Sequence, residues 1–304
     1  MTSIESPQPD DIGLVPDGPS VVALGGGHGL AASLQAARSY ASTLTGVVSV
    51  GDDGGSSGRL RTEFGITPPG DVRRCISALV VEPTLLSQAL EYRFTDGELK
   101  DHPIGNLLLT GLAMVAGDFE EAVDELCRLV GVADTIVPAA SIPLRLLADS
   151  DRGRIEGEVT IEKATGIRNL RFEPAEPPVP SRAVEAVVEA DQVIVGPGSL
   201  FTSVLASAVV PGILDAVDKS EAQRVYVANV ANDKAEARGF GLAAHLEALA
   251  QHGVTVDVVV APTTLPDEPI EGVEVVWADV AADDGWGHDP AKLGPVLAAA
   301  YRRR

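Results

Sequence analysis

The sequence has few of the residues on which disulfide-rich or membrane-spanning proteins depend. It contains two cysteines, Cys75 and Cys127, which lie far apart and match no CxxC or Cys/His metal-binding spacing. The cysteines therefore indicate neither a disulfide framework nor a structural zinc site, and a cytoplasmic protein is favoured. The longest apolar stretches fall short of the roughly 18 residues that a membrane span requires. The N-terminus has neither a basic start nor the apolar segment of a signal peptide. We therefore expect no membrane insertion.

Positive charge is scarce as well. Lysine and arginine total 23 against 44 acidic residues, which leaves a net charge of −21. Such a chain has no broad basic surface to neutralise a nucleic-acid backbone, so we expect no nucleic-acid partner. Any phosphate group must be bound locally, by backbone N–H groups and a few arginines.

Aromatic residues make up only 4% of the chain, which favours layers of small aliphatic strands and helices over an aromatic-rich β-sandwich. Strand-like segments are expected at 21–24, 44–50, 192–195, 224–229, 254–261 and 273–277. Helical segments are expected at 30–38, 71–81, 83–93, 104–116, 119–130, 181–189, 201–208 and 242–252. This alternation predicts an α/β fold with a Rossmann-like three-layer core and a mostly parallel sheet.

We divide the chain into a flexible N-terminal tail, residues 1–18, which is rich in Pro, Asp and Ser, and a single domain, residues 19–304. Within this domain, the segment from about 135 to 180 has a different character. Short β-like pieces at 143–148, 157–162 and 170–173 are separated by Gly, Asp and Arg turns. The sequence therefore predicts a small β-rich insertion.

The first expected strand runs into a glycine-rich turn that contains Gly27-x-Gly29-x-x-Ala32. This pattern satisfies a loose dinucleotide-binding motif between a strand and a helix. Its glycines would let backbone N–H groups approach a pyrophosphate at the helix N-terminus. A tight strand-to-helix turn without a ligand is the alternative. We take Gly26, Gly27, His28 and Gly29 as candidate ligand-binding residues.

The second expected strand also ends in a polar loop, residues 51–61, which lacks the Gly-Lys-Ser/Thr of a Walker A motif. Carboxylates there could hold a sugar hydroxyl or a divalent ion, while hydroxyls, N–H groups and an arginine meet phosphate oxygens. A loop that is simply solvated is the alternative. The candidate ligand-binding residues are Asp52, Asp53, Gly54, Gly55, Ser56, Ser57 and Arg59. No metal site is assigned, except that Asp52 and Asp53 would hold Mg²⁺ in a metal-dependent enzyme.

Three further segments carry candidate residues. Gly196, Gly198 and Ser199 repeat the strand, glycine loop and helix arrangement, although Ser199 lacks the surroundings of a catalytic nucleophile. Arg73 follows a Pro-Pro-Gly-Asp turn, whose Asp71 could equally serve as a helix cap. Asn106 could recognise a base or a sugar through its amide, or only start a helix.

Six blocks of this sequence, taken together and in order, resemble the YvcK-type gluconeogenesis factor family of the CofD-like superfamily, in an actinobacterial form. The blocks are residues 25–30, 52–61, 68–73, 102–107, 196–203 and 210–213, within a resemblance that covers about residues 21 to 260. The chain departs from the family pattern at His28, where Thr is frequent, and at Gly51, where Ala is usual. It also departs at 229–237, where a Pro-Gly and a Thr are missing.

The resemblance implies a Rossmann-like, cytoplasmic protein that binds a UDP-sugar such as UDP-N-acetylglucosamine. It implies a regulatory role in cell morphogenesis and cell-wall synthesis on gluconeogenic carbon sources, exerted through wall-synthesis proteins rather than by catalysis. The alternative is a CofD-like phosphotransferase or nucleotidyltransferase that uses Mg²⁺. An NAD-dependent oxidoreductase rests on the loose glycine pattern alone and ranks last. Self-association is left open.

Overall fold

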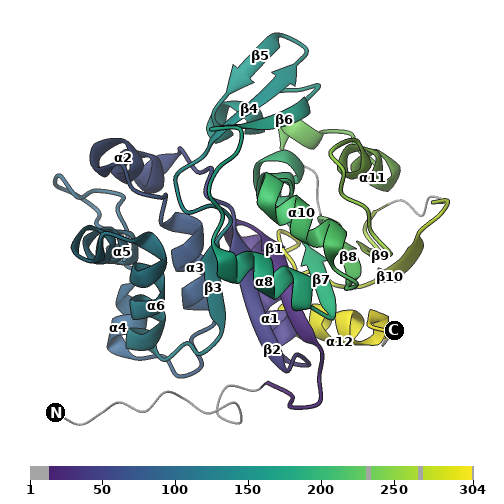
Figure 1. The fold of residues 1–304 in the computed structure, drawn as a ribbon, viewed down its shortest axis with the longest axis horizontal. Helices are drawn as coiled ribbons and strands as arrows, with labels where there is room; N and C mark the ends of the chain where they lie inside the picture. The colour runs from purple at the N-terminus through teal and green to yellow at the C-terminus, as the bar shows by residue number, and fades with distance from the viewer. Residues whose placement is uncertain (1–13, 231–233, 266–269, 303–304) are drawn as a thin grey trace.

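A seven-stranded sheet forms the centre of the protein (Figure 1). The computed structural model describes residues 14–230, 234–265 and 270–302. Neighbouring strands in the order β10-β9-β8-β7-β1-β2-β3 are all parallel. The strands are β1 (Ser20–Gly25), β2 (Thr43–Val48), β3 (Thr135–Pro138), β7 (Gln192–Val195), β8 (Gln223–Val227), β9 (Val258–Pro262) and β10 (Glu274–Ala278).

Both faces of the sheet are buried, as the apolar runs predict. In β1, Val22 and Leu24 point into one hydrophobic cluster, whereas Val21 and Ala23 point into the other. Successive side chains of a strand lie on opposite faces, so an uninterrupted apolar strand needs a helical layer on each side.

Helices supply these two layers. One face packs against helices whose apolar residues share a cluster with Val21: α1 (Gly27–Arg38), α3 (Gly70–Ala78), α5 (Ile104–Ala116), α6 (Phe119–Val130) and α12 (Pro290–Ala300). The other face packs against α8 (Ser181–Glu189), α10 (Pro211–Lys219) and α11 (Leu242–Gln251). The predicted three-layer α/β core is confirmed.

Several expected boundaries are wrong. The helix expected at 83–93 is only α4 (Leu85–Ala89), because the chain turns after it and pairs Arg93 with Pro103. The segment at 201–208 is a π-helix, η2 (Leu200–Leu205), followed by α9 (Ala206–Ala208). Helices α10 and α12 were not expected; each begins with a proline, which suits the first helical position. Residues 55–61, expected as part of a polar loop, instead belong to helix α2 (Gly55–Phe64), and a 3₁₀ turn, η3 (Ala235–Ala237), follows β8 in the chain.

Residues 1–13 of the expected tail, 1–18, lie outside the described residues. Its last part contacts the domain. The Val15 N–H donates to the Ala41 carbonyl at 2.7 Å, and Leu14 packs partly buried against the core. The boundary at 18 is therefore too late by a few residues.

The β-rich insertion is a three-stranded antiparallel sheet in the order β5-β4-β6, formed by β4 (Arg145–Ser150), β5 (Gly153–Glu156) and β6 (Arg168–Glu173). Two expectations about it are corrected. Strand β3, placed in the insertion from sequence, pairs with β2 in the main sheet. Segment 157–162, expected as a strand, forms helix α7 (Glu158–Glu162), which buries Ile161.

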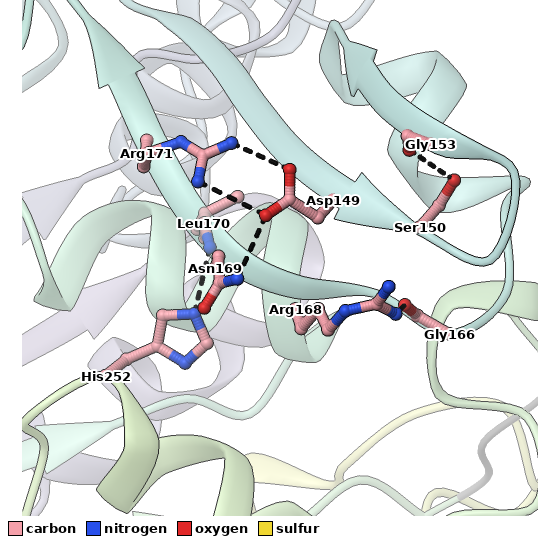
Figure 2. A network of polar contacts seen from close by, with 9 residues as sticks. All are labelled: Asp149, Ser150, Gly153, Gly166, Arg168, Asn169, Leu170, Arg171 and His252. Atoms are coloured by element: carbon pink, nitrogen blue, oxygen red, sulfur yellow. Dashed lines mark hydrogen bonds and ion pairs between the residues drawn. The ribbon is translucent and has the colours of Figure 1, made fainter.

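Hydrogen bonds attach this small sheet to the main body (Figure 2). His252, at the end of α11, bonds the Ala248 carbonyl through Nδ1, so its Nε2 is free to accept the Leu170 N–H of β6 at 3.0 Å. Within the sheet, the Asp149 carboxylate accepts from Arg171 and Asn169. These bonds, Arg171 first, lower the pKa of Asp149 to about 2. The insertion is therefore a connected unit joined to α11.

Candidate nucleotide-binding site

The glycine turn after β1 leads directly into α1. Gly27 has φ +61°, a left-handed conformation that glycine adopts without strain. Gly26 is the N-cap of α1, and no side chain caps this helix end within the described residues. The first N–H groups of the helix are therefore available to an anion, and the helix dipole favours one there.

A second glycine loop, after β7, lies against the first. A Cβ on Gly29 would overlap the carbonyl oxygen of Pro197, so only glycine permits this approach. Asn229, just after β8, holds the second loop from both sides. Its Oδ1 accepts from the Gly198 N–H at 2.9 Å, and its Nδ2 donates to the Gly198 carbonyl at 2.6 Å.

The two loops border a cavity of about 590 Å³, which we call the main cavity. From β1 the chain proceeds to β2 on one side, and from β7 it proceeds to β8 on the other. The main cavity thus lies at the topological switch point, outside the carboxyl ends of the strands, where open α/β sheets bind ligands.

Acidic side chains face the main cavity from three elements. Asp52 follows β2, Asp71 begins α3 and Glu158 begins α7 of the insertion. Burial, followed by the charges of Asp52 and Asp71, raises the pKa of Glu158 to about 9. Burial and Asp71 also raise the pKa of Asp52. The Asp71 carboxylate pairs with Arg74 at 2.5 Å and does not cap its helix, so the capping interpretation of Asp71 is wrong.

A fourth carboxylate comes from the loop after β8. Glu236 is 1% exposed and lines the main cavity. Burial raises its pKa to about 7, although Lys234, the Thr202 hydroxyl and the backbone of Phe201 favour its charged form. Lys234 itself forms an ion pair with Glu162 of the insertion.

His28 occupies the first turn of α1 and lines the main cavity. Burial lowers its pKa, and the charges of Arg74 and Arg73 lower it further. The imidazole is therefore neutral at pH 7, and it can offer one N–H donor and one acceptor nitrogen.

A smaller cavity of about 180 Å³, the side chamber, adjoins the main cavity and shares Asp52 and Arg74 with it. A chain of side chains lies along it. Arg73 Nε donates to Asn106 Oδ1 at 3.1 Å, and Asn106 Nδ2 donates to Ser56 Oγ at 3.0 Å. Ser56 Oγ lies within hydrogen-bonding distance, 2.8 Å, of His102 Nδ1. The amide of Asn106 is thereby fixed in one orientation.

Most residues expected at the site line one of these two cavities. The main cavity contains Gly26, Gly27, His28, Gly29, Asp52, Gly198 and Ser199. The side chamber contains Asp52, Gly54, Gly55, Ser56, Ser57, Arg73 and Asn106.

Three expected residues line neither cavity. The Asp53 carboxylate accepts the Val159 N–H at 3.0 Å and so holds the insertion. Arg59 donates to the Lys100 carbonyl. Gly196 has φ +86°, and its carbonyl accepts a hydrogen bond from the Ser33 hydroxyl, so it fixes the backbone of the loop without lining a cavity.

Sequence reasoning missed several lining residues. Asn229 and Glu236 belong to the 229–237 block, so a signal for them existed. Glu158 had no signal, because its segment was expected as a strand. Trp286 and His288 come from near the C-terminus, to which no chemistry was assigned. The Trp286 ring is 78% exposed at the cavity edge.

Asp52 and Asp53 do not converge on one point, since Asp52 Oδ1 accepts the Gly54 N–H while Asp53 bonds the insertion. Across the described ranges, no group of three or more His, Cys, Asp or Glu residues is arranged to hold a metal ion. Asp52, Asp71 and Glu158 all line the main cavity, but they are not arranged as such a group.

In the described part of the chain, no single helix has the length and apolar character of a membrane span. The bent pair Leu200–Ala208 and Pro211–Lys219 passes the same criteria when both helices are taken together.

Known proteins resemble this chain in sequence and in fold. The family model described as 2-phospho-L-lactate transferase CofD matches residues 21–288. A gluconeogenesis factor of Halalkalibacterium halodurans is 38% identical over 82% of this chain and 79% of its own. A Mycobacterium tuberculosis protein whose name also contains gluconeogenesis factor is 41% identical over 91% of this chain and 89% of its own. The crystal structure of a UPF0052-family protein from Bacillus halodurans superposes with a TM-score of 0.86 at 32% identity, covering 92% of this chain and 99% of that one. The chain therefore belongs to the CofD family, among the proteins named as gluconeogenesis factors.

Proposed function

We propose that the main cavity binds a UDP-sugar, such as UDP-N-acetylglucosamine. The observation that carries the proposal is the meeting of the β1 and β7 glycine loops at the switch point of the sheet. The diphosphate oxygens would accept hydrogen bonds from the N–H groups in the first turn of α1, a helix end that no side chain caps in the described residues. A cavity of about 590 Å³ is of the size that small-molecule ligands occupy.

The rest of the lining suits the other parts of such a ligand. Glu236 and Asp52 offer carboxylate oxygens to sugar or ribose hydroxyls. The exposed ring of Trp286 offers a flat face on which a base can stack.

The biological role that we propose is regulatory. The chain would act in the cytoplasm, sense the UDP-sugar and adjust cell-wall synthesis and cell shape during growth on gluconeogenic carbon sources. The names of the relatives support the gluconeogenic link. The signal would pass through cell-wall synthesis proteins. A ligand that contacts both the insertion and the core could change the surface of this chain to which those proteins bind.

The CofD family supports a second candidate, a Mg²⁺-dependent phosphotransferase or nucleotidyltransferase. The observation in its favour is that Asp52, Asp71 and Glu158 face one cavity. A bound cation would favour their ionised forms, whereas burial, followed by the charges of the neighbouring acids, raises the pKa of Asp52 and of Glu158.

Calorimetry with UDP-N-acetylglucosamine, with and without Mg²⁺, tests the first proposal when it is combined with product analysis. Binding without metal and without turnover supports a sensor, while metal-dependent group transfer would establish the enzyme instead. NAD(H) binding more tightly than the UDP-sugar would contradict both.

A pair of variants locates the ligand. Glu236→Gln should weaken UDP-sugar binding about tenfold, because a charged acceptor is lost. Its thermal stability should not fall, since the amide removes a buried charge. Glu185→Gln, on the exposed face of α8, is the matched control and should bind as the native chain does. Equal affinity in both variants would exclude Glu236 from the site.

A further inference from the structure

The side chamber has a composition unlike that of the protein as a whole. In a chain of net charge −21, three arginines, Arg73, Arg74 and Arg93, line a space of about 180 Å³ together with one acid, Asp52. Arg73 is 1% exposed, so its charge is almost removed from water. A space of this size has room for one small group and not for a nucleoside.

The three guanidinium groups are close enough to repel one another. Burial is the largest cause that lowers the pKa of Arg73. Glu91 raises this pKa, and the charges of Arg74 and Arg93 lower it further. Besides burial, which is the largest cause, all three arginines lower the pKa of His28, which lines the main cavity. Gathering like charges is costly unless anions offset them. Glu91 and Asp71 pair with Arg73 and Arg74, and a bound anion would offset the remaining charge.

Each arginine is also held in place by bonds that leave part of its donor fork unused. Arg73 bonds Asn106 and Glu91, Arg74 bonds Asp71, and Arg93 donates through Nη1 to the Asp101 carbonyl at 2.9 Å. An arginine has five N–H donors, so donors remain on each.

Neutral donors complete the chamber. The N-cap of α2 is Gly54, and no side chain in the described residues caps this ten-residue helix. The first N–H groups of α2 are therefore without a side-chain partner from a cap among those residues. Gly55, Ser56 and Ser57, at the start of α2, line the same chamber as the arginines. Arginine forks, uncapped helical N–H groups and hydroxyls together match the oxygens of a phosphate group.

We propose that the side chamber is a second anion subsite that binds a phosphate group, separate from the glycine turn of α1. Its distinguishing residue is Arg93, which the loop after α4 brings to the chamber. The phosphate has two chemical sources, a phosphate of the nucleotide in the main cavity or a second phosphorylated molecule. The proposal concerns the same composite site as the UDP-sugar proposal, but its test does not depend on that ligand.

Inorganic phosphate is the probe, and its binding is followed by ³¹P NMR titration. Arg93→Gln should weaken phosphate binding about tenfold, because a charged donor is lost. Arg93 is exposed, so folding should be retained. Asn106→Asp, which introduces a negative charge next to Arg73, should weaken phosphate binding at least as much. Arg128→Gln, which removes an exposed arginine of α6 that lines neither cavity, is the control with the same change in charge.

Phosphate affinity that is equal in Arg93→Gln, Asn106→Asp and the native chain would overturn the proposal, as would an absence of phosphate binding by the native chain. Repeating the titration with saturating UDP-N-acetylglucosamine identifies the source. Exclusion of phosphate assigns the subsite to the nucleotide, and continued binding assigns it to a second molecule. Failure of UDP-N-acetylglucosamine to bind would refute the proposed function and leave the phosphate result standing.

Discussion

Glu158 is held at the main cavity in a state that opposes folding at neutral pH. Its ordinary pKa of 4.5 rises to about 9, because burial and the neighbouring acids Asp52, Asp71 and Asp53 disfavour its charge. Between these two values the unfolded chain has released the proton that the folded chain keeps. The free energy of unfolding therefore falls as pH rises from about 4.5 to about 9.

Glu158→Gln should remove this cost, since glutamine has the shape of the protonated acid and carries no charge. At pH 7 the interval above 4.5 is 2.5 pH units, and about 1.36 kcal/mol per unit gives a stabilisation of up to about 3 kcal/mol. At pH 4 both states of the native chain bind the proton, so the gain should vanish.

Urea unfolding of both chains at pH 4, 5.5, 7 and 8 measures the difference. The control is Glu156→Gln, on β5 of the same insertion, whose side chain is 66% exposed. It should change the free energy of unfolding by no more than about 0.5 kcal/mol at any of these values. A gain in Glu158→Gln that does not grow with pH, or a loss at pH 7, would refute the assignment of a partly buried, protonated Glu158.

Two further predictions concern the glycine loops. Gly29→Ala should destabilise the fold by about 2 kcal/mol, because overlap with the Pro197 carbonyl costs about 3 kcal/mol and the helix preference for alanine returns about 1. Gly111→Ala, in open space on α5, should instead gain up to about 1 kcal/mol in the same thermal unfolding assay. Asn229→Ala should cost about 2 kcal/mol through its two lost bonds to Gly198 and should weaken UDP-sugar binding, measured by calorimetry.

Other results would contradict these expectations. Equal stability of Gly29→Ala and Gly111→Ala would show that the two loops separate easily. An Asn229→Ala chain that retains full affinity would show that the second loop keeps its shape without the amide.

The sequence alone predicted six of the seven strands of the main sheet, a helical layer on each of its faces and the places where ligand loops begin. Apolar runs such as 21–24 and 192–195 predict buried strands because their pattern is local. The glycines that follow them predict close backbone approach for the same reason. The family was recognisable from blocks that lie in these same loops.

Tertiary structure decided which side chains of those loops reach the cavities. Asp52 and Asp53 are neighbours in the chain, yet only Asp52 faces the ligand space, because the Val159 N–H takes the other carboxylate. Glu158 and Arg93 arrive from the insertion and from the loop after α4. Their positions depend on how distant segments pack, and no local pattern in the chain records that packing.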